Sequence, residues 1–200
     1  LRLAKTYGFK TDVHLMPDLP GSSIEKDEAM IQQVLTHCDY EPDYLKLYPT
    51  KILNDTEIKK WYDSGEYVQY ADTDPEGLIE MLIRAKEMIK RRTRLNRLER
   101  DFPTSSLKGG MKFPNLRQEL LKRMDERKLT CKCIRCREVK NKDMDHNDVH
   151  MHVDEFIGSG AKEYYISYEN KDKSVLYGFI RLRINNKLDV PKIKALHDSL

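Results

Sequence analysis

The sequence lacks a long apolar stretch, and this absence argues against one large class of proteins. No run of 18 apolar residues occurs, although a membrane-spanning helix needs about 20. No positively charged segment followed by an apolar one opens the chain, so we expect neither a secretory signal nor a membrane partner. Cysteine is also scarce, with four residues in 200, which argues against a disulfide-rich secreted fold. These absences favour a reducing, cytoplasmic location.

A strong excess of either charge is missing as well. Lysine and arginine number 36 and the acidic residues 33, which leaves a net charge of +3. This value is too small to predict nucleic-acid binding by itself. A hydrophobic content of 39% in 200 residues is enough for the core of one domain or of two partial ones.

The few cysteines are concentrated in one place. Cys131, Cys133 and Cys136 fall within six residues, which is too close for disulfide bonds of ordinary geometry. Such a density of cysteines is typical of a soft-metal site. The nearest candidates for a fourth ligand are the histidines that follow, His146, His150 and His152. We predict a tetrahedral zinc site. An iron–sulfur cluster and unligated thiols are the alternatives, and the single residue between Cys131 and Cys133 favours a structural zinc knuckle.

Basic residues gather between residues 84 and 100, where only Glu87 and Glu99 oppose them. Such clusters neutralise phosphates and release counterions. The helix dipole also favours cations near the end of a helix, but it explains only the first residues of the cluster. We therefore predict that the following arginines contact nucleic acid: Arg91, Arg92, Arg94, Arg97 and Arg100.

Strand-like and helix-like segments alternate in the first hundred residues. After a short helix that ends at Gly8, we predict strands at residues 13–16, 44–48 and 95–102 and helices at 22–37, 54–65 and 74–92. Strands separated by helices predict βαβ units, a parallel sheet and an α/β fold. The carboxyl ends of such strands surround the ligand pocket in a barrel.

Two strand ends carry polar groups beside rigid exits. Pro17 and Asp18 follow the first predicted strand, whereas Lys46 and Tyr48 lie in the second. We predict a cofactor-binding role for Pro17 and Asp18 and a catalytic role for Lys46 and Tyr48. Ordinary turn chemistry is the alternative, because proline and glycine stop strands in any fold.

The pattern changes in the second half of the chain. Residues 103–114 read as a loop and residues 116–129 as a helix, and a polar segment follows the cysteines up to Met151. From residue 163 to residue 184 apolar residues alternate about a turn at 170–173, which predicts a β-hairpin. A second domain is therefore expected to begin near residue 150.

Three strings stand out when the chain is considered as a whole. They are MPDLPG at 16–21, LKLYPT at 45–50 and RLERDFP at 97–103, and the cysteine knuckle follows them. In this order they resemble the catalytic subunits of Elongator. The resemblance continues through residues 115–117 and 167–169 to 178–183 and so covers nearly all of the chain.

The resemblance implies a fold and an activity. That family joins a radical S-adenosylmethionine barrel to a GNAT-type acetyltransferase domain, and it is implicated in carboxymethylating the wobble uridine of tRNA with acetyl-CoA. Residues 1–103 would be later βα units of the barrel, 104–150 a linker helix and zinc motif, and 151–200 the truncated start of the GNAT-like domain. Lys46 and Tyr48 would position the acyl or adenosyl group. The complete protein would use a [4Fe–4S] cluster, with tRNA and other Elongator-like subunits as partners.

The resemblance also implies that parts of the enzyme lie elsewhere. The cluster-binding cysteines of the family would precede Leu1, and its acetyl-CoA loop, which cradles the pyrophosphate, would follow Leu200. Residues 194–197 match the corresponding string of the family only at Leu196 and His197. We therefore expect the 200 residues, as a piece of a longer protein, to be inactive alone. A non-catalytic, zinc-stabilised RNA-binding module and a protein acetyltransferase fragment are the competing hypotheses.

Overall fold

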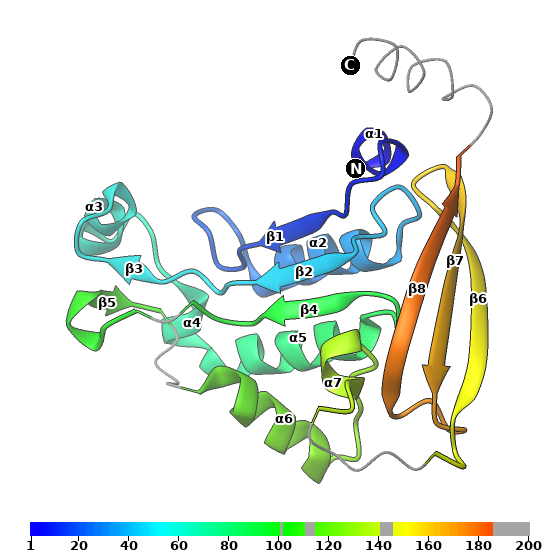
Figure 1. The fold of residues 1–200 in the computed structure, drawn as a ribbon. Helices are drawn as coiled ribbons and strands as arrows, with labels where there is room; N and C mark the ends of the chain where they lie inside the picture. Colours follow the sequence, from blue (N-terminus) through cyan, green and yellow to red (C-terminus); the bar gives the residue numbers. More distant parts are fainter. Residues whose placement is uncertain (101, 111–114, 141–145, 186–200) are drawn as a thin grey trace.

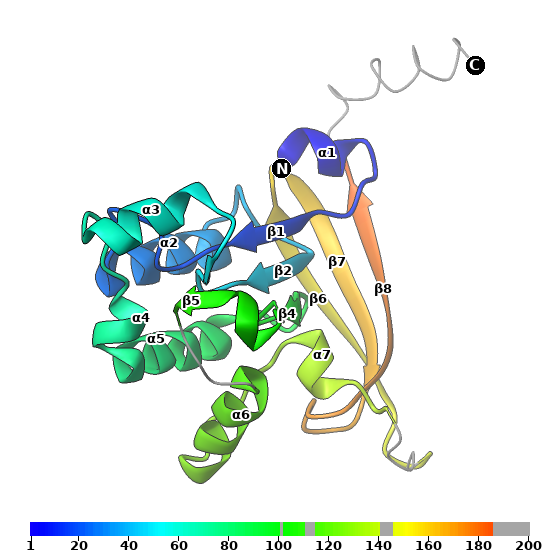
Figure 2. The ribbon, with the colours of Figure 1, turned by 90° about the vertical axis from the view of Figure 1, so that its left-hand side faces the viewer.

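A three-stranded parallel sheet backed by helices stands against a three-stranded antiparallel sheet in the computed structural model of the chain (Figures 1 and 2). The structure describes residues 1–100, 102–110, 115–140 and 146–185. None of the helices in these ranges has both the length and the apolar character that crossing a bilayer requires.

The parallel sheet forms the first unit. Its order is β1 (Asp12–Leu15), β2 (Tyr44–Leu47) and β4 (Arg94–Arg97), and both strand pairs are parallel. Helices α2 (Ile24–Thr36) and α5 (Pro75–Met88) connect these strands and lie on the same face of the sheet (Figures 1 and 2). The predicted βαβ arrangement is therefore confirmed.

Local sequence signals explain where the two helices begin. The Ser23 side chain accepts a hydrogen bond from the backbone N–H of Lys26, and Asp74 accepts one from Gly77 before a proline at the first helical position. Both helices then bury one face against the sheet. The apolar residues of this core include Ile31, Leu35, Leu45, Leu47, Leu78 and Leu82. The helix at the start of the chain is α1 (Arg2–Thr6), and Gly8 follows it with φ +83°.

Strand β4 is shorter than the sequence suggested. The predicted strand 95–102 ends at Arg97. Among the described strands β4 pairs with β2 alone, and β2 itself ends at Leu47, two residues before Pro49. Arg100 therefore lies beyond the sheet. The placement of Arg100 on a strand was wrong.

The sequence pattern also missed a small ribbon beside the sheet. Strands β3 (Ile52–Leu53) and β5 (Leu107–Gly109) pair antiparallel inside segments predicted as loop or helix start. Three short elements accompany them, α3 (Glu57–Ser64), α4 (Tyr70–Thr73) and the 3-10 helix η1 (Thr104–Ser106). Two- and three-residue strands carry too little periodicity to be recognised in a sequence.

The linker packs onto the first unit. Helix α6 (Leu116–Glu126) buries Leu116, Leu120 and Met124 in the same core as α5, and Cys133 belongs to this core as well. The four-residue helix α7 (Ile134–Arg137) follows Cys133 directly. The cysteine knuckle is thus attached to the parallel-sheet unit through apolar contacts.

The antiparallel sheet contains one strand more than expected. The predicted hairpin is β7 (Ala161–Glu169) and β8 (Leu176–Ile184). The additional strand β6 (His150–Gly158) pairs with β7 along its whole length, although its first residues read as polar loop. Residues 194–197, which were compared with the family string, lie outside the described residues.

Candidate functional site

The face of the parallel sheet opposite α2 and α5, here called the inner face, carries a cluster of polar side chains. The Lys46 Nζ lies 2.8 Å from His14 Nε2 and 3.0 Å from the Asp12 carboxylate. Tyr48 meets the His14 ring edge-on, with 5.9 Å between the ring centroids. The two predicted catalytic residues, Lys46 and Tyr48, are therefore neighbours of one imidazole, and their catalytic role stays a prediction.

The cluster can hold a proton in a defined place. An ammonium group only donates hydrogen bonds, so the contact with Lys46 favours the His14 tautomer that accepts at Nε2 and carries its proton on Nδ1. His14 and Asp12 were not predicted from the sequence. The alternation of polar and apolar residues over 12–15, which matches that of β2, could have placed both side chains on the face that carries Lys46. The inner face thus presents a carboxylate, an ammonium, an imidazole and a phenol.

Asp18 is buried and fixes the backbone at the end of β1. Its carboxylate accepts hydrogen bonds of 3.0 Å from the backbone N–H groups of Tyr70 and Ala71, and its φ is 67°. Burial raises the pKa of Asp18 to about 6, although these two backbone hydrogen bonds act in the opposite direction. The carbonyl of Pro17 accepts from the backbone and side chain of Thr50. A cofactor-binding role for Pro17 and Asp18 stays a prediction.

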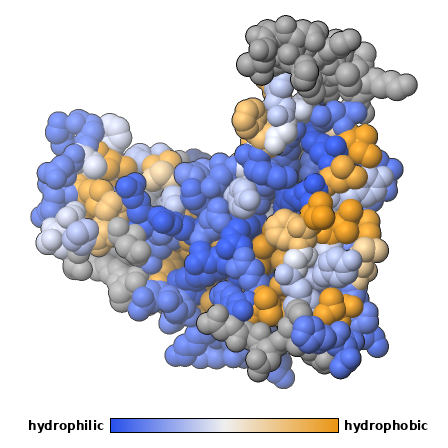
Figure 3. All heavy atoms as spheres, in the orientation of Figure 1, coloured by the Kyte–Doolittle hydropathy of each residue, from blue (hydrophilic) through white to orange (hydrophobic). Residues whose placement is uncertain are grey.

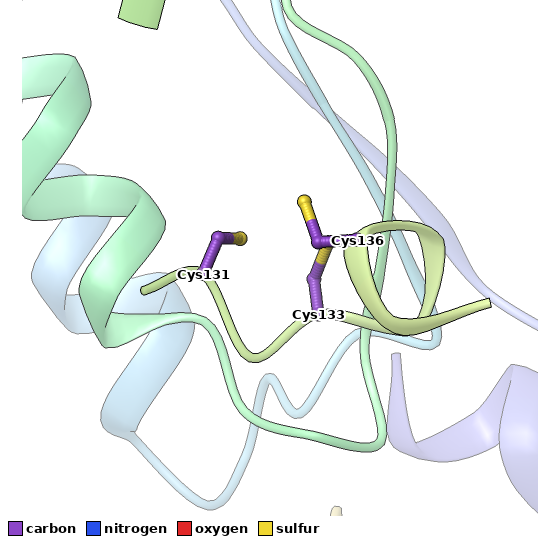
Figure 4. A group of neighbouring side chains, drawn as sticks. All are labelled: Cys131, Cys133 and Cys136. Atoms are coloured by element: carbon purple, nitrogen blue, oxygen red, sulfur yellow. The ribbon is translucent and has the colours of Figure 1, made fainter. Parts of the chain in front are cut away.

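The three knuckle cysteines converge on one space beside α7 (Figure 4). Their sulfur atoms all lie within 4.8 Å of one another, and tetrahedral zinc–thiolate geometry with bonds of about 2.3 Å needs sulfurs about 3.8 Å apart. Cys133 is buried, and Cys131 and Cys136 are half-buried. Hydrogen bonds from Cys131 and Cys136 lower the pKa of the Cys133 thiol, whereas the pKa of Cys131 is raised.

Two cations contact the same thiol and support an anionic cluster. Lys86 Nζ lies 3.8 Å from Cys136 Sγ, and Arg117 Nη2 lies 3.6 Å from it. Lys86 is 0% exposed, and among the described residues this sulfur is the only hydrogen-bond partner that the structure gives it. Because a buried ammonium needs a counter-charge, the donor set fits a thiolate-bound soft metal ion.

The histidines do not join this cluster. In the described part of the chain, the group around the knuckle contains the three cysteines and no histidine. His150 contacts Asp148 at 3.0 Å and lies at the start of β6, and His152 lies two residues further along the same strand. The structure therefore assigns no fourth ligand.

The first part of the basic cluster is paired with carboxylates. Arg91 contacts Glu169 of β7 at 2.8 Å, and Arg92 contacts Glu41 at 2.9 Å and also stacks on the Phe156 ring. Arg94 is paired with Glu138. These arginines hold the antiparallel sheet and the knuckle against the first unit.

The last part of the cluster is free of such pairs. Arg97 and Arg100 are exposed, and neither has a carboxylate partner among the described residues. Arg97 is also the register partner of Lys46 across β2 and β4. The structure thus separates the five predicted nucleic-acid contacts into three paired arginines and two unpaired ones beside the inner face.

Comparisons with known proteins agree with this architecture. Residues 42–126 match the Radical_SAM C-terminal domain family. A tRNA uridine(34) acetyltransferase of Methanocaldococcus jannaschii is 34% identical over 190 residues, which is 91% of this chain and 34% of that protein. Elongator complex protein 3 of Homo sapiens is 34% identical over 185 residues, which is 90% of this chain and 33% of that protein. The chain is a homologue of part of the Elongator catalytic subunit.

A solved structure extends this homology to three dimensions. The archaeal Methanocaldococcus infernus Elp3 with an N-terminal deletion superposes with a TM-score of 0.84 at 34% identity, covering 93% of this chain and 44% of that one. The resemblance and the fold class predicted from the sequence are therefore confirmed. The chain spans about a third of the length of its curated relatives.

Proposed function

We propose that the chain contributes to modification of the wobble uridine of tRNA as part of an Elongator-type enzyme that uses acetyl-CoA and S-adenosylmethionine. The observation that carries this proposal is the polar cluster of Asp12, His14, Lys46 and Tyr48 on the helix-free face of the sheet. Homology to proteins named tRNA uridine(34) acetyltransferase supports the substrate class. The activity belongs to the complete enzyme, and the chain supplies one wall of its site.

Within this proposal the inner-face residues bind and orient the reacting groups. Lys46 would position an acyl or adenosyl group through its ammonium, and Tyr48 would do so through its hydroxyl. Asp18 and Pro17 would support a cofactor indirectly, because they set the backbone where β1 ends. S-adenosylmethionine with an iron–sulfur cluster would supply radical chemistry, and acetyl-CoA would supply the two carbons.

The iron–sulfur cluster does not fit the cysteines described here. The knuckle is the one group of three cysteines in the described ranges, and it is packed into the core with α5 and α6 rather than placed on the inner face. Cys38 is exposed at the end of α2. We therefore derive no step through a cluster and assign the knuckle to a structural zinc ion.

Contact with tRNA is the second part of the proposal. Arg97 and Arg100 are the direct candidates, because their charges are not compensated by described carboxylates. Arg91, Arg92 and Arg94 would reach phosphates only by exchanging their present partners, Glu169, Glu41 and Glu138. The inner face and its unpaired arginines would then lie along the bound RNA.

The test is acetyl-CoA hydrolysis by the protein as its native source produces it, with and without tRNA. Hydrolysis stimulated by tRNA is expected, and Lys46→Gln should abolish the stimulation while leaving tRNA affinity unchanged. Lys26→Gln, which alters an exposed lysine in the first turn of α2, is the matched control. Salt-dependent tRNA binding without any hydrolysis would instead favour a non-catalytic, zinc-stabilised RNA-binding module.

A further inference from the structure

A cavity of about 410 Å³ opens where β4 ends and α6 begins, and this volume falls within the roughly 300–1,000 Å³ of ligand pockets. Its lining is unusual for the number of guanidinium groups, which come from Arg97, Arg100, Arg117 and Arg135. These residues come from three separate segments, which are the end of β4 with the residues just after it, the first turn of α6 and the short helix α7. The fold therefore gathers positive charges from segments that are distant in sequence.

Apart from Arg2, the arginines elsewhere in the described chain have carboxylate partners. The ion-paired residues are Arg84, Arg91, Arg92, Arg94, Arg123, Arg127, Arg137, Arg181 and Arg183. The four arginines of the cavity have no carboxylate partner within the described ranges. Like charges gathered in this way repel one another, and among the described residues their one anionic contact is that of Arg117 with the Cys136 thiol. An anion bound among them would therefore be favoured.

The hydrogen-bond state of two of these side chains supports this interpretation. Nη1 of Arg117 is buried without a hydrogen-bond partner, while its Nη2 contacts Cys136 Sγ. Arg135 donates a hydrogen bond to the carbonyl of Asn96. Both guanidinium groups are thus held in place with donor capacity to spare.

The one carboxylate in the lining is already in use. Glu99 is paired with Lys51 through one oxygen, and its other oxygen accepts a hydrogen bond of 3.3 Å from the backbone N–H of Leu116. The amides of Asn115 and Gln118 complete the wall and can donate hydrogen bonds. The net character of the cavity is therefore that of a donor-rich, cationic site.

The geometry points to a phosphate-binding pocket for the RNA backbone, formed by Arg97, Arg100, Arg117 and Arg135. Forked guanidinium donors match the oxygen geometry of phosphate. Arg97 is the register partner of Lys46, so a phosphate held here would bring its nucleotide to the inner face. This inference rests on the proposed function, which supplies RNA as the ligand, and it adds residues of α6 and α7 to the contact surface.

The decisive experiment measures tRNA affinity as a function of salt concentration for the protein as its native source produces it and for its double variant Arg97→Gln/Arg100→Gln. Both residues are exposed, so the fold should tolerate the change. Loss of two phosphate contacts should reduce the slope of log K against log salt by roughly 0.7–0.9 for each contact and weaken binding on the order of tenfold. The control Arg84→Gln/Arg127→Gln removes the same charge from ion-paired positions and should change the slope much less.

Other outcomes separate this inference from the proposed function. An unchanged slope in the pocket variant would overturn the inference while leaving tRNA binding intact. A titration with coenzyme A distinguishes the source of the phosphate: loss of coenzyme A binding alone would assign the pocket to a cofactor phosphate and overturn the RNA assignment. If the unaltered protein, as its native source produces it, binds no tRNA, the proposed function fails. Inorganic phosphate is then the probe, and the absence of any NMR shift at the four guanidinium groups would reject the pocket itself.

Discussion

Buried charges in this chain each have an identifiable partner. Lys86 contacts the Cys136 thiol, Glu169 contacts Arg91 and Arg137, and Asp18 accepts from backbone amides. A charge removed from water without such a partner is strongly destabilising. Single substitutions at these points should therefore report on the interactions that hold the knuckle and the second sheet in place.

Replacing Cys133 tests the knuckle. Cys133→Ser removes one of three converging thiols, so we expect loss of bound zinc and unfolding of the region between α6 and β6, because metal binding is coupled to folding. Zinc content by mass spectrometry and hydrogen exchange of residues 127–140 are the measurements. The exposed Cys38→Ser is the matched control and should keep its metal. Full zinc occupancy in Cys133→Ser would refute the ligand assignment.

Asp18 should lower the free energy of unfolding as the pH rises, which is the reverse of the usual effect of a carboxyl group. Because its pKa is raised to about 6 from 3.8, the folded chain holds more protons than the unfolded chain between these values, and stability falls as pH rises through this window. The shift corresponds to about 3 kcal/mol. Asp18→Asn should remove this component, so the free energy of unfolding of the wild type relative to the variant should be larger at pH 4.5 than at pH 7.5. Urea unfolding at both pH values checks this, and an equal difference at both would contradict it.

The sequence predicted the site residues unequally. The cysteine knuckle could be recognised because its three cysteines are close together in the chain. Lys86, in contrast, reads as one of many cations near the end of a helix, yet it is 0% exposed and contacts a thiol from a segment 50 residues away. Pairing across such distances leaves no periodic signal, and the carboxylate partners of Arg91, Arg92 and Arg94 were missed for the same reason.

The antiparallel sheet directs its charged residues toward the first unit and many of its apolar residues toward solvent, the reverse of the usual arrangement. The face of β6, β7 and β8 that meets the first unit carries ion-paired residues such as Asp154, Glu163, Glu169 and Arg181. The opposite face is mostly apolar apart from the Glu155–Lys162 pair, and apolar residues are visible over this sheet in Figure 3. Its exposed members include Met151, Val153, Ile157, Ile180, Leu182 and Ile184. The first residues of β6 were predicted as part of the polar segment that ends at Met151, whereas the turn between β7 and β8 identified the hairpin.

Replacing Glu169 tests the interface between the antiparallel sheet and the first unit. It is 0% exposed and lies 2.8 Å from Arg91 and 2.6 Å from Arg137. Glu169→Gln leaves Arg137 without its carboxylate and leaves Arg91 with Asp154 at 3.5 Å, and breaking a buried pair in this way costs about 3 kcal/mol. We expect a lower melting temperature and faster hydrogen exchange in β7. Glu155→Gln on the exposed face, where Glu155 pairs with Lys162, should leave the melting temperature unchanged, and equal behaviour of the two variants would contradict the interface.

At the scale of the whole molecule, the arginines that follow α5 divide into two groups with different consequences. The paired group, Arg91, Arg92 and Arg94, joins the parallel-sheet unit to the second sheet and to α7. The unpaired group, Arg97 and Arg100, lies beyond the interface at the edge of the cavity. A single basic stretch of sequence thus contributes first to domain attachment and then, as proposed, to RNA binding.

Substituting the paired group and substituting the unpaired group should have opposite effects on melting temperature and on the salt dependence of tRNA binding. Changing Arg91, Arg92 and Arg94 together to Ala removes the partners of Glu169, Glu41 and Glu138, so we expect a lower melting temperature and proteolytic release of residues 150–185. The salt dependence of tRNA binding should change less than in Arg97→Gln/Arg100→Gln, whose melting temperature should stay the same. Melting curves and salt titrations on both variants provide the comparison. The contrary outcome is a triple variant that keeps its melting temperature but flattens the salt slope by two or more units. It would show that these three arginines contact phosphates directly and do not hold the fold together, because each lost phosphate contact lowers the salt slope by about one unit.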